Sequence, residues 1–431
     1  MAEGIPPARA KEEPRSGTAG TTDRTAREAP SRTASASAAF PSSAGSPGGP
    51  SPEPASAPVP GNTDGKEAGA SARGRDFGIR EGGIRESGNG APGWRYGTGQ
   101  AYAAIDLGTN NCRLLIAKPS GDNFVVVDAF SRVVRLGEGL AQTGELSGAA
   151  MDRALAALHV CADKLRRRNV HLARSVATEA CRRATNGAAF IERVREETGI
   201  ALDIISAQEE ARLAVLGCHI LLEQGQGPAM IFDIGGGSTE LVLIENGPTI
   251  PRILDWQSVP WGVVSLSETC GAEGATADER AARYGAMRRI VSDSFSSFAD
   301  RIMADHGAFL DQPRRLLGTS GTVTTLASLH LDLPHYDRNM VDGPILPTEA
   351  MRGISARLST LSPEERRRLP CIGKERADLV VAGCAILESI LDIWPADRLG
   401  VADRGIREGI LRSLMAAGVH SGGSLRRARG L

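Results

Sequence analysis

This sequence lacks the features of a disulfide framework, a zinc site or a membrane span. Seven cysteines are present without a C-x-x-C pair, and several lie in apolar stretches such as "VVAGCAILESIL", as buried thiols do in a reducing compartment. No apolar run approaches the roughly 18 residues that a membrane span needs, and the N-terminus lacks the basic-then-apolar order of a signal peptide. We therefore expect a cytoplasmic protein with no membrane partner.

An excess of positive charge is also missing. The 50 Lys and Arg residues balance 51 Asp and Glu, for a formal net charge of −1, so no global basic field attracts nucleic acid. The basic runs "LRRRN" and "EERRRL" are interpreted as solvated helix faces. The seven histidines form no H-x-x-x-H or HD pair, which argues against a metal site built from histidine. No nucleic-acid partner is expected.

Large apolar residues are nearly absent from the first 97 positions, which are dominated by Pro, Gly, Ser, Ala and Thr. Such a segment buries too little surface to offset the entropy cost of ordering. Residues 1–97 are therefore predicted to be a disordered tail. A role as a tether or a partner-binding segment is the alternative.

From Ala101 onward the sequence has the residue pattern of a folded α/β protein. Strand patterns such as "AYAAIDLGTNNCRLLIA" and helical spacing follow each other in the order β-β-β-α-β-α-β-α, and the order restarts at "AMIFDIGGG". The pattern predicts one lobe over 101–227 and a second over 228–417, with a C-terminal tail over 418–431.

The two lobes begin with the same motif. The offset is 233 − 106 = 127 residues, and it aligns four pairs of positions: Asp106 with Asp233, Gly108 with Gly235, Asn111 with Ser238, and Leu114 with Leu241. A repeat of domain size predicts two similar lobes with their turns facing each other, and so a site in the cleft between them.

Each repeated turn places an Asp-x-Gly motif at the end of one strand and small or polar residues before the next. Backbone amides can hold phosphate oxygens, and an aspartate can hold hydrated Mg²⁺, so the pair indicates a nucleotide or polyphosphate site. A tight glycine hairpin is the alternative for a single turn. The pairing of the turns and a third glycine turn, "GTSGTVTTL" at 318–326, favour the ligand site.

Seven motifs occur in the order found in the exopolyphosphatase and guanosine pentaphosphate phosphohydrolase (Ppx/GppA) family. They are "AAIDLGTNNCRLLIA", "VATEACRRATN", "IISAQEEARLAVLG", "FDIGGGSTELVLI", "GTSGTVTTL", "GKERADLVVAG" and "GIREGIL". The chain thus resembles this family over residues 101–417, in a short form without the HD-type C-terminal domain. The resemblance implies two RNase H-like lobes of the actin type and Mg²⁺-dependent hydrolysis of a terminal phosphoanhydride. Inorganic polyphosphate is the first expected substrate and guanosine pentaphosphate the second.

The stretch "SAQEEAR" contains two adjacent glutamates. Ser206 and Glu209 fit a helix capping box, which gives Glu209 a structural interpretation. The resemblance implies that Glu210 activates the attacking water, a role in which nearby phosphates would raise its pKa. A solvated first-turn glutamate favoured by the helix dipole is the alternative.

The resemblance implies the remaining site residues. The expected Mg²⁺ side consists of Asp106, Asp233 and Glu240. The expected phosphate contacts come from Asn110, Asn111, Gly235, Gly236, Gly237, Ser238, Ser320, Gly321, Arg182 and Arg376. For the two arginines, whose planar fork suits phosphate oxygens, a solvated surface position is the alternative.

Some features depart from the family pattern, and some alternatives stay open. Thr109-Asn110-Asn111 replaces the usual Ser-Asn-Ser but keeps short polar side chains, and Asp342 replaces a frequent histidine and is given no role. The sequence does not fix the oligomeric state, for which a homodimer is considered. A small-molecule kinase of the same fold and a non-catalytic nucleotide-sensing or filament-forming protein are the rival functions.

Overall fold

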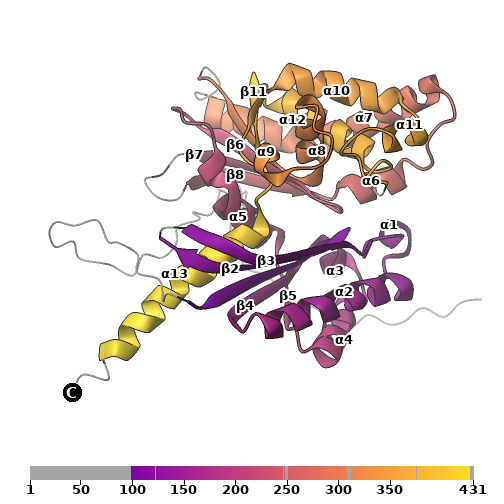
Figure 1. The fold of residues 1–431 in the computed structure, drawn as a ribbon. Helices are drawn as coiled ribbons and strands as arrows, with labels where there is room; N and C mark the ends of the chain where they lie inside the picture. Colours follow the sequence, from indigo (N-terminus) through magenta and orange to yellow (C-terminus); the bar gives the residue numbers. More distant parts are fainter. Residues whose placement is uncertain are drawn as a thin grey trace, which may run out of the picture. The chain divides into compact units, whose positions relative to one another are not determined.

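The computed structural model describes residues 99–121, 123–245, 247, 251–307, 312–374 and 376–427. The predicted disordered tail, 1–97, lies outside these residues. Within them the chain forms two mixed sheets with helices packed against them, which confirms the predicted α/β class (Figure 1).

The first lobe contains a five-stranded sheet of order β3-β2-β1-β4-β5. Strands β1, β2 and β3 are antiparallel neighbours, whereas β4 and β5 run parallel to β1. Its elements are β1 (Ala101–Leu107), β2 (Asn111–Ser120), β3 (Asn123–Val133), α1 (Leu140–Thr143), α2 (Gly148–Arg167), β4 (Val170–Ala177), α3 (Glu179–Arg183), α4 (Gly187–Thr198), β5 (Leu202–Ile204), α5 (Ala207–Cys218) and the short 3-10 helix η1 (His219–Leu221).

The second lobe repeats this plan with a six-stranded sheet of order β10-β11-β9-β6-β7-β8. The short edge strand β10 was not predicted. The elements are β6 (Ala229–Ile234), β7 (Thr239–Glu245), β8 (Arg252–Val259), α6 (Val263–Thr269), α7 (Ala277–His306), β9 (Arg315–Thr319), α8 (Gly321–His330), α9 (Arg338–Val341), β10 (Ile345–Pro347), α10 (Thr348–Thr360), α11 (Pro363–Arg367), α12 (Val380–Ile393), β11 (Arg398–Ala402) and α13 (Ile406–Arg427).

The repeat read from the sequence is present in the strand register. Asp106 lies opposite Arg113 in the β1–β2 pair, and Asp233 lies opposite Glu240 in the β6–β7 pair. The same 127-residue offset relates both pairs. In each turn a glycine amide donates to a carbonyl three residues later at 2.9 Å, from Gly108 to Asn111 and from Gly235 to Ser238. The two turns therefore have the same backbone hydrogen bond.

Each lobe has its own apolar core. In the first lobe, residues of β1 and β2 pack with α2 and with Phe190 and Val194 of α4. In the second lobe, Phe232 of β6 packs with long helix α7 and the apolar helix α12. Full burial of such aliphatic and aromatic side chains stabilises each lobe by about 1.5–3 kcal/mol per residue.

Helices α5 and α13 link the two lobes. The side chains of α5 pack on the first sheet through Leu213 and on the second through Val215. Helix α13 also packs on the first lobe, where Ile410 is buried against the same cluster as Leu213 (Figure 1). An ideal Cβ on Gly409 would lie 2.0 Å from the Leu213 carbonyl oxygen, so only glycine permits this approach. The last helix thus returns to the first lobe, and it continues to Arg427, past the predicted boundary at 417.

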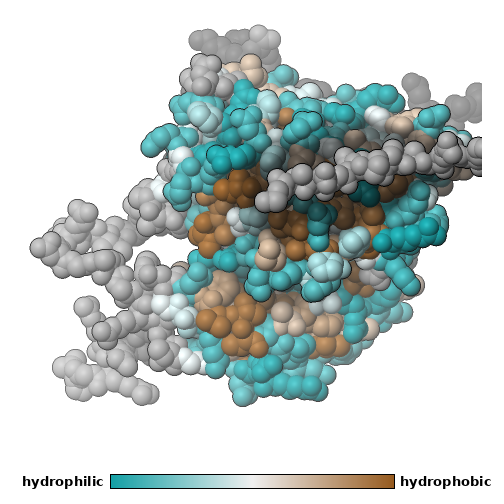
Figure 2. Space-filling view, turned by 45° about the horizontal axis from the view of Figure 1, so that its top comes forward, coloured by the Kyte–Doolittle hydropathy of each residue, from teal (hydrophilic) through white to brown (hydrophobic). Residues whose placement is uncertain are grey.

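Hydrophilic side chains cover most of the face drawn in Figure 2, with hydrophobic side chains gathered in a few patches. Within the part of the chain that the structure describes, no helix has both the length and the apolar character needed to cross a membrane.

Candidate active site

The two repeated turns touch each other across the interlobe cleft. An ideal Cβ on Gly236 would lie 3.0 Å from the Thr109 Cβ and 3.1 Å from the Asn110 amide nitrogen, and one on Gly237 would lie 2.7 Å from the Thr109 Oγ1. The glycines of the "GGG" run have no positive φ. Gly236 and Gly237 are favoured because the opposite turn leaves little room for a side chain, and backbone amides of both lobes therefore lie next to one space.

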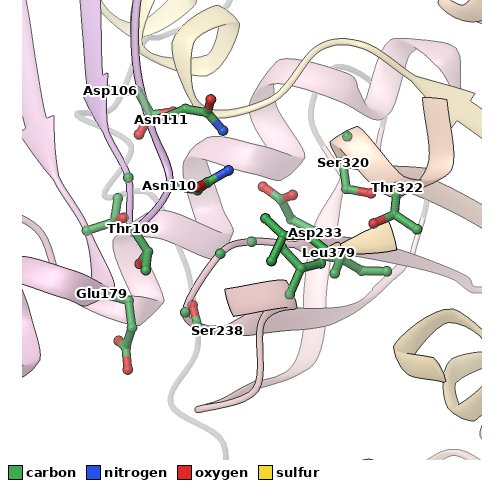
Figure 3. Close-up of a pocket in the computed structure, with 18 of the residues that line it drawn as sticks. Asp106, Thr109, Asn110, Asn111, Glu179, Asp233, Ser238, Ser320, Thr322 and Leu379 are labelled. Carbon is green, nitrogen blue, oxygen red and sulfur yellow. The ribbon is translucent and has the colours of Figure 1, made fainter. Parts of the chain in front are cut away.

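That space is a cleft of about 930 Å³ lined by both lobes. Figure 3 shows residues of the first lobe on one side and residues of the second on the other. Most of the predicted site residues line it: Asp106, Asn110, Asn111, Glu210, Asp233, Gly235, Gly236, Gly237, Ser238, Ser320, Gly321 and Arg376. Arg182 and Glu240 do not line it.

Glu210 is a buried carboxylate at the edge of this cleft, with only 6% of its surface exposed. It occupies the first turn of α5, which Ser206 caps by accepting from the Glu209 amide at 3.2 Å. Burial raises the pKa of Glu210 well above its usual value, the nearby Glu240 carboxylate raises it further, and Arg182 lowers it. A carboxylate with a raised pKa is a stronger base, as a group that takes a proton from water requires.

Arg182 lies behind Glu210 instead of facing the cleft. Its Nη1 and Nη2 atoms lie 3.1 and 3.2 Å from Oε2 of Glu210. The same guanidinium donates to Oε2 of Glu179 at 2.5 and 3.1 Å. A charge-assisted network of this kind fixes the carboxylate orientation. In this structure, therefore, Arg182 contacts two acids, and its predicted contact with phosphate stays a prediction.

Glu209 points away from the cleft. Its carboxylate accepts from Arg174 at 2.9 Å and from Arg212 at 2.7 and 3.0 Å. Only the Ser206 half of the expected capping box forms, because these arginines bind the Glu209 side chain instead. The role of Glu209 is therefore structural, as expected, although its partners are different.

The two strand-end aspartates, Asp106 and Asp233, are partly buried and line the cleft. Burial raises the pKa of Asp106, and burial together with Glu240 raises that of Asp233 to about 8, while Arg113 lowers the pKa of both. Glu240 itself lies behind the turn, where Ser238 and Ser258 donate to its Oε1 at 2.7 and 3.0 Å. Burial raises its pKa to about 7. These carboxylates repel one another, which a bound cation would relieve.

The carboxylates of the cleft form an open donor set for a metal ion. Among the described residues no three Asp, Glu, His or Cys side chains converge as a ready metal cage. Mg²⁺ keeps several waters and is usually held by one or two carboxylates together with substrate phosphates. Asp106 and Asp233, both on the cleft surface, fit that pattern, whereas Glu240 fits a position beside the ion.

The third glycine turn closes the far side of the cleft. Ser320 caps α8 by accepting from the Val323 amide at 3.0 Å. The Arg376 guanidinium lies over this turn and donates to Thr325 Oγ1 at 3.1 Å and to the Gly321 carbonyl at 3.5 Å. The positive end of α8 and a guanidinium therefore face the same space, as an anion site requires.

Comparison with known proteins agrees with this geometry. The family model of the Ppx/GppA phosphatase family matches residues 115–417. The chain belongs to the Ppx/GppA phosphatase family. It is 29% identical over 326 residues to "Exopolyphosphatase 2" of Mycobacterium tuberculosis, a match that covers 72% of this chain and 98% of that protein.

Solved structures support the same assignment. The Aquifex aeolicus member of the Ppx/GppA family is 28% identical, with a TM-score of 0.59 over 74% of this chain and 98% of that one. An exopolyphosphatase from Cytophaga hutchinsonii, at 24% identity, has the same fold with a TM-score of 0.65 over 74% and 98%. As a Ppx/GppA protein with two actin-type lobes, the chain is a phosphoanhydride hydrolase, which sets aside the kinase and scaffold alternatives.

Sequence reasoning missed two residues of this Ppx/GppA site. Glu179, in the motif "VATEACRR", lines the cleft and holds Arg182. Arg113 also lines it and lowers the pKa of both aspartates. The repeat contained a signal for Arg113, because 113 + 127 = 240 places it at the position that matches Glu240. No local signal distinguished Glu179 from an ordinary helix-start acid.

Proposed function

We propose that this protein removes the terminal phosphate of inorganic polyphosphate, in a Mg²⁺-dependent attack by water that Glu210 activates. The observation that carries this proposal is the buried Glu210 carboxylate, which lines the same cleft as the two facing turns. Backbone amides of those turns supply donors for phosphate oxygens without charge repulsion. A base and a phosphate cradle in one space are what hydrolysis of a phosphoanhydride needs.

The proposed reaction is an in-line attack of water on the terminal phosphorus. Glu210 takes one proton from water, the water oxygen bonds to the terminal phosphorus, and the bridging P–O bond breaks. The products are orthophosphate and a chain shorter by one unit. Arg182 would orient Glu210 by its two hydrogen bonds and lowers the pKa of Glu210 against the effect of burial. The amides of Gly236 and Gly237 would donate to the terminal phosphate oxygens.

Asp106 and Asp233 would hold the Mg²⁺, with Glu240 beside it. The bound ion would neutralise charge on the phosphate oxygens, as in phosphoryl transfer generally. Asn110 and Asn111 face the opposite turn from the first lobe (Figure 3), where their amides would orient the substrate.

Polyphosphate is the first substrate because the relatives named above include exopolyphosphatases. Guanosine pentaphosphate presents the same terminal anhydride to the same turns and is the second substrate to test. A cytoplasmic location is supported by the seven free thiols. The homodimer, and the absence of nucleic-acid and membrane partners, stay predictions.

The test is a phosphate-release assay of the purified full chain with long-chain polyphosphate, tripolyphosphate, guanosine pentaphosphate and ATP, with Mg²⁺ and with a chelator. We expect the highest kcat/KM with polyphosphate and release reduced to background by the chelator. Phosphate release from guanosine pentaphosphate alone would contradict the assignment of polyphosphate as the substrate. Full activity in chelator would contradict the requirement for Mg²⁺.

A further inference from the structure

A side-chain hydrogen bond joins the two lobes outside the cleft, where helices α1 and α6 face each other (Figure 1). Glu268, on α6 of the second lobe, accepts at Oε1 from the backbone amide of Gly139 in the first lobe at 3.0 Å. Gly139 is the last residue before α1 and has a left-handed φ of 75°. Neither residue lines the cleft. The bond therefore connects the lobes without touching the space where the chemistry is expected.

The loop that ends at Gly139 fastens the turn of the first lobe. Two amides at the start of loop 134–139 donate to the Asn110 carbonyl at 2.9 and 3.0 Å, and the Gly137 amide donates to the Thr109 carbonyl at 2.9 Å. An ideal Cβ on Gly137 would lie 2.3 Å from Thr109 Cγ2, so the loop packs directly on the turn. A shift of the loop would therefore shift the turn as well.

Helix α6 fastens the turn of the second lobe in the same way. The Val264 amide donates to the Gly236 carbonyl at 2.8 Å. The internal repeat relates this bond to the one from Gly137 to Thr109, because 137 + 127 = 264 and 109 + 127 = 236. Glu268 lies about one helical turn after Val264 on the same helix. Its bond to the first lobe therefore connects two equivalent elements, each of which holds one of the facing turns.

Loop 134–139 needs such support because its backbone is strained. Arg135 has a φ of 47°, a left-handed conformation that residues other than glycine rarely adopt. A backbone of this kind persists only where the surrounding contacts hold it. Arg153 of α2 holds the start of the loop by donating to the Val134 and Arg135 carbonyls at 2.8 and 3.1 Å. Glu268 holds its end.

The stability of the fold does not by itself explain a glutamate at position 268. Its second oxygen, Oε2, is buried and has no hydrogen-bond partner among the described residues, and the hydroxyl of the neighbouring Ser267 is buried in the same state. A buried oxygen without a partner destabilises a protein, and an apolar side chain would avoid that cost. The contact with Gly139 therefore points to a function of Glu268 beyond packing.

We propose that Glu268 is a positioning residue, which sets the spacing of the two facing turns by holding Gly139 to α6. The proposal rests on the proposed function, in which these turns hold the terminal phosphate. Because each turn is fastened to one partner of this bond, loss of the bond lets the turns separate. The terminal phosphorus then moves relative to the attacking water, and a misplacement of about 1 Å can lower a rate by about a hundredfold.

Three variants separate the hydrogen bond from the charge. Glu268→Ala removes the acceptor and should lower kcat by at least about tenfold, with KM within about threefold of wild type because the groups that bind the substrate remain. Glu268→Gln keeps a carbonyl oxygen at the same reach and should keep kcat within about threefold of wild type. Glu268→Asp keeps the charge on a shorter side chain and should be as slow as Glu268→Ala. Glu196→Ala, on an exposed position of α4, is the matched control and should behave as wild type.

Hydrogen exchange of the substrate-free proteins tests the same bond without any turnover. Amides of loop 134–139, followed by mass spectrometry, should exchange about tenfold faster in Glu268→Ala and Glu268→Asp than in wild type and Glu268→Gln. Amides of α4 should exchange equally in all four proteins. Faster exchange throughout the chain together with a wild-type kcat would show that Glu268 only supports the fold, and would overturn the proposal.

Three further results would also overturn it: a wild-type kcat in Glu268→Ala, unchanged exchange of the loop, or a Glu268→Gln enzyme as slow as Glu268→Ala, which would assign the effect to the negative charge. If Glu268→Ala does not fold, the comparison of Glu268→Gln with Glu268→Asp decides the question. The exchange experiment also separates this proposal from the proposed function. If the wild type releases no phosphate from polyphosphate but loop exchange follows the variants as expected, the proposed function fails and Glu268 still sets the spacing of the turns.

Discussion

The Nη1 atom of Arg182 lies 3.1 Å from Oε2 of Glu210, so the arginine expected to bind phosphate is also a hydrogen-bond partner of the proposed base. Its positive charge opposes the effect of burial and of Glu240 on the pKa of Glu210. The pair therefore sets the pH range in which Glu210 is ionised.

Arg182→Gln should move the acid limb of the kcat profile to higher pH. Arg182 lowers the pKa of Glu210, so its removal raises that pKa, and a base works only when it is ionised. Each unit of pKa costs about tenfold in rate below the pKa. The measurement is phosphate release between about pH 5 and pH 9, with Arg183→Gln, an outward neighbour, as the control. An unchanged pH profile of kcat together with a higher KM would show that Arg182 binds phosphate and does not set the pKa of Glu210.

Glu210→Gln should bind polyphosphate almost normally and release phosphate at least about a hundredfold more slowly, because glutamine cannot take a proton from water. Glu209→Gln should keep most of the activity and lose a little stability, because its partners are Arg174 and Arg212 outside the cleft. Steady-state rates and thermal melts of both variants decide this. A Glu210→Gln enzyme that keeps the wild-type rate would show that Glu210 is not the general base. An inactive Glu209→Gln enzyme would show that Glu209 has that role instead.

Asp233→Asn should raise the Mg²⁺ concentration that gives half-maximal activity, because it removes a charge from the cleft surface and keeps the side-chain shape. The fold should persist, since burial disfavours the charged form of Asp233. A Mg²⁺ titration of activity measures the effect, and a thermal melt confirms folding. Wild-type Mg²⁺ dependence would remove Asp233 from the metal site.

The metal-free protein should lose stability as pH rises toward about 8. Folding raises the pKa of Asp233 from 3.8 to about 8 and that of Glu240 from 4.5 to about 7. The folded state then binds more protons than the unfolded state, so the stabilising effect of these protons is full at low pH and is lost as pH rises through the raised values.

Melting in chelator between about pH 6 and pH 9 tests this window. Asp233→Asn should flatten the decline, and Mg²⁺ should restore the Tm of the wild type at the alkaline end. A Tm that rises across this window in chelator would show that the carboxylates are not strained by their mutual repulsion.

Gly236→Ala should slow phosphate release by at least about tenfold, because the added methyl would meet Thr109 and Asn110 at 3.0 and 3.1 Å and force the turns apart. Gly353→Ala is the control. Gly353 lies on the exposed face of α10 with nothing within 4 Å of its would-be Cβ, so alanine should stabilise the protein by up to about 1 kcal/mol. Equal activity of both variants would show that the turns need not touch.

The sequence by itself determined the α/β class, the two lobes, the repeated turns and the aspartates that end β1 and β6. These features follow from local patterns, because the alternation of a strand and the glycines of a turn can be recognised within a few residues. The repeat then extends the assignment from one lobe to the other. The position of Glu210 in the first turn of α5 also follows from a local signal, the Ser206 cap.

Only the tertiary structure decided which charged side chains contact each other. Arg182 and Arg376 looked alike in sequence, yet α5 places Glu210 within hydrogen-bonding distance of the first, and the third glycine turn lies under the second. Glu240 lies behind its turn because β8 brings Ser258 to it. The cleft is lined by Arg113 of β2 and by Ile406 at the start of α13, elements from opposite ends of the described chain. Such encounters depend on how sheets and helices pack, and no local pattern encodes the partner of a long flexible side chain.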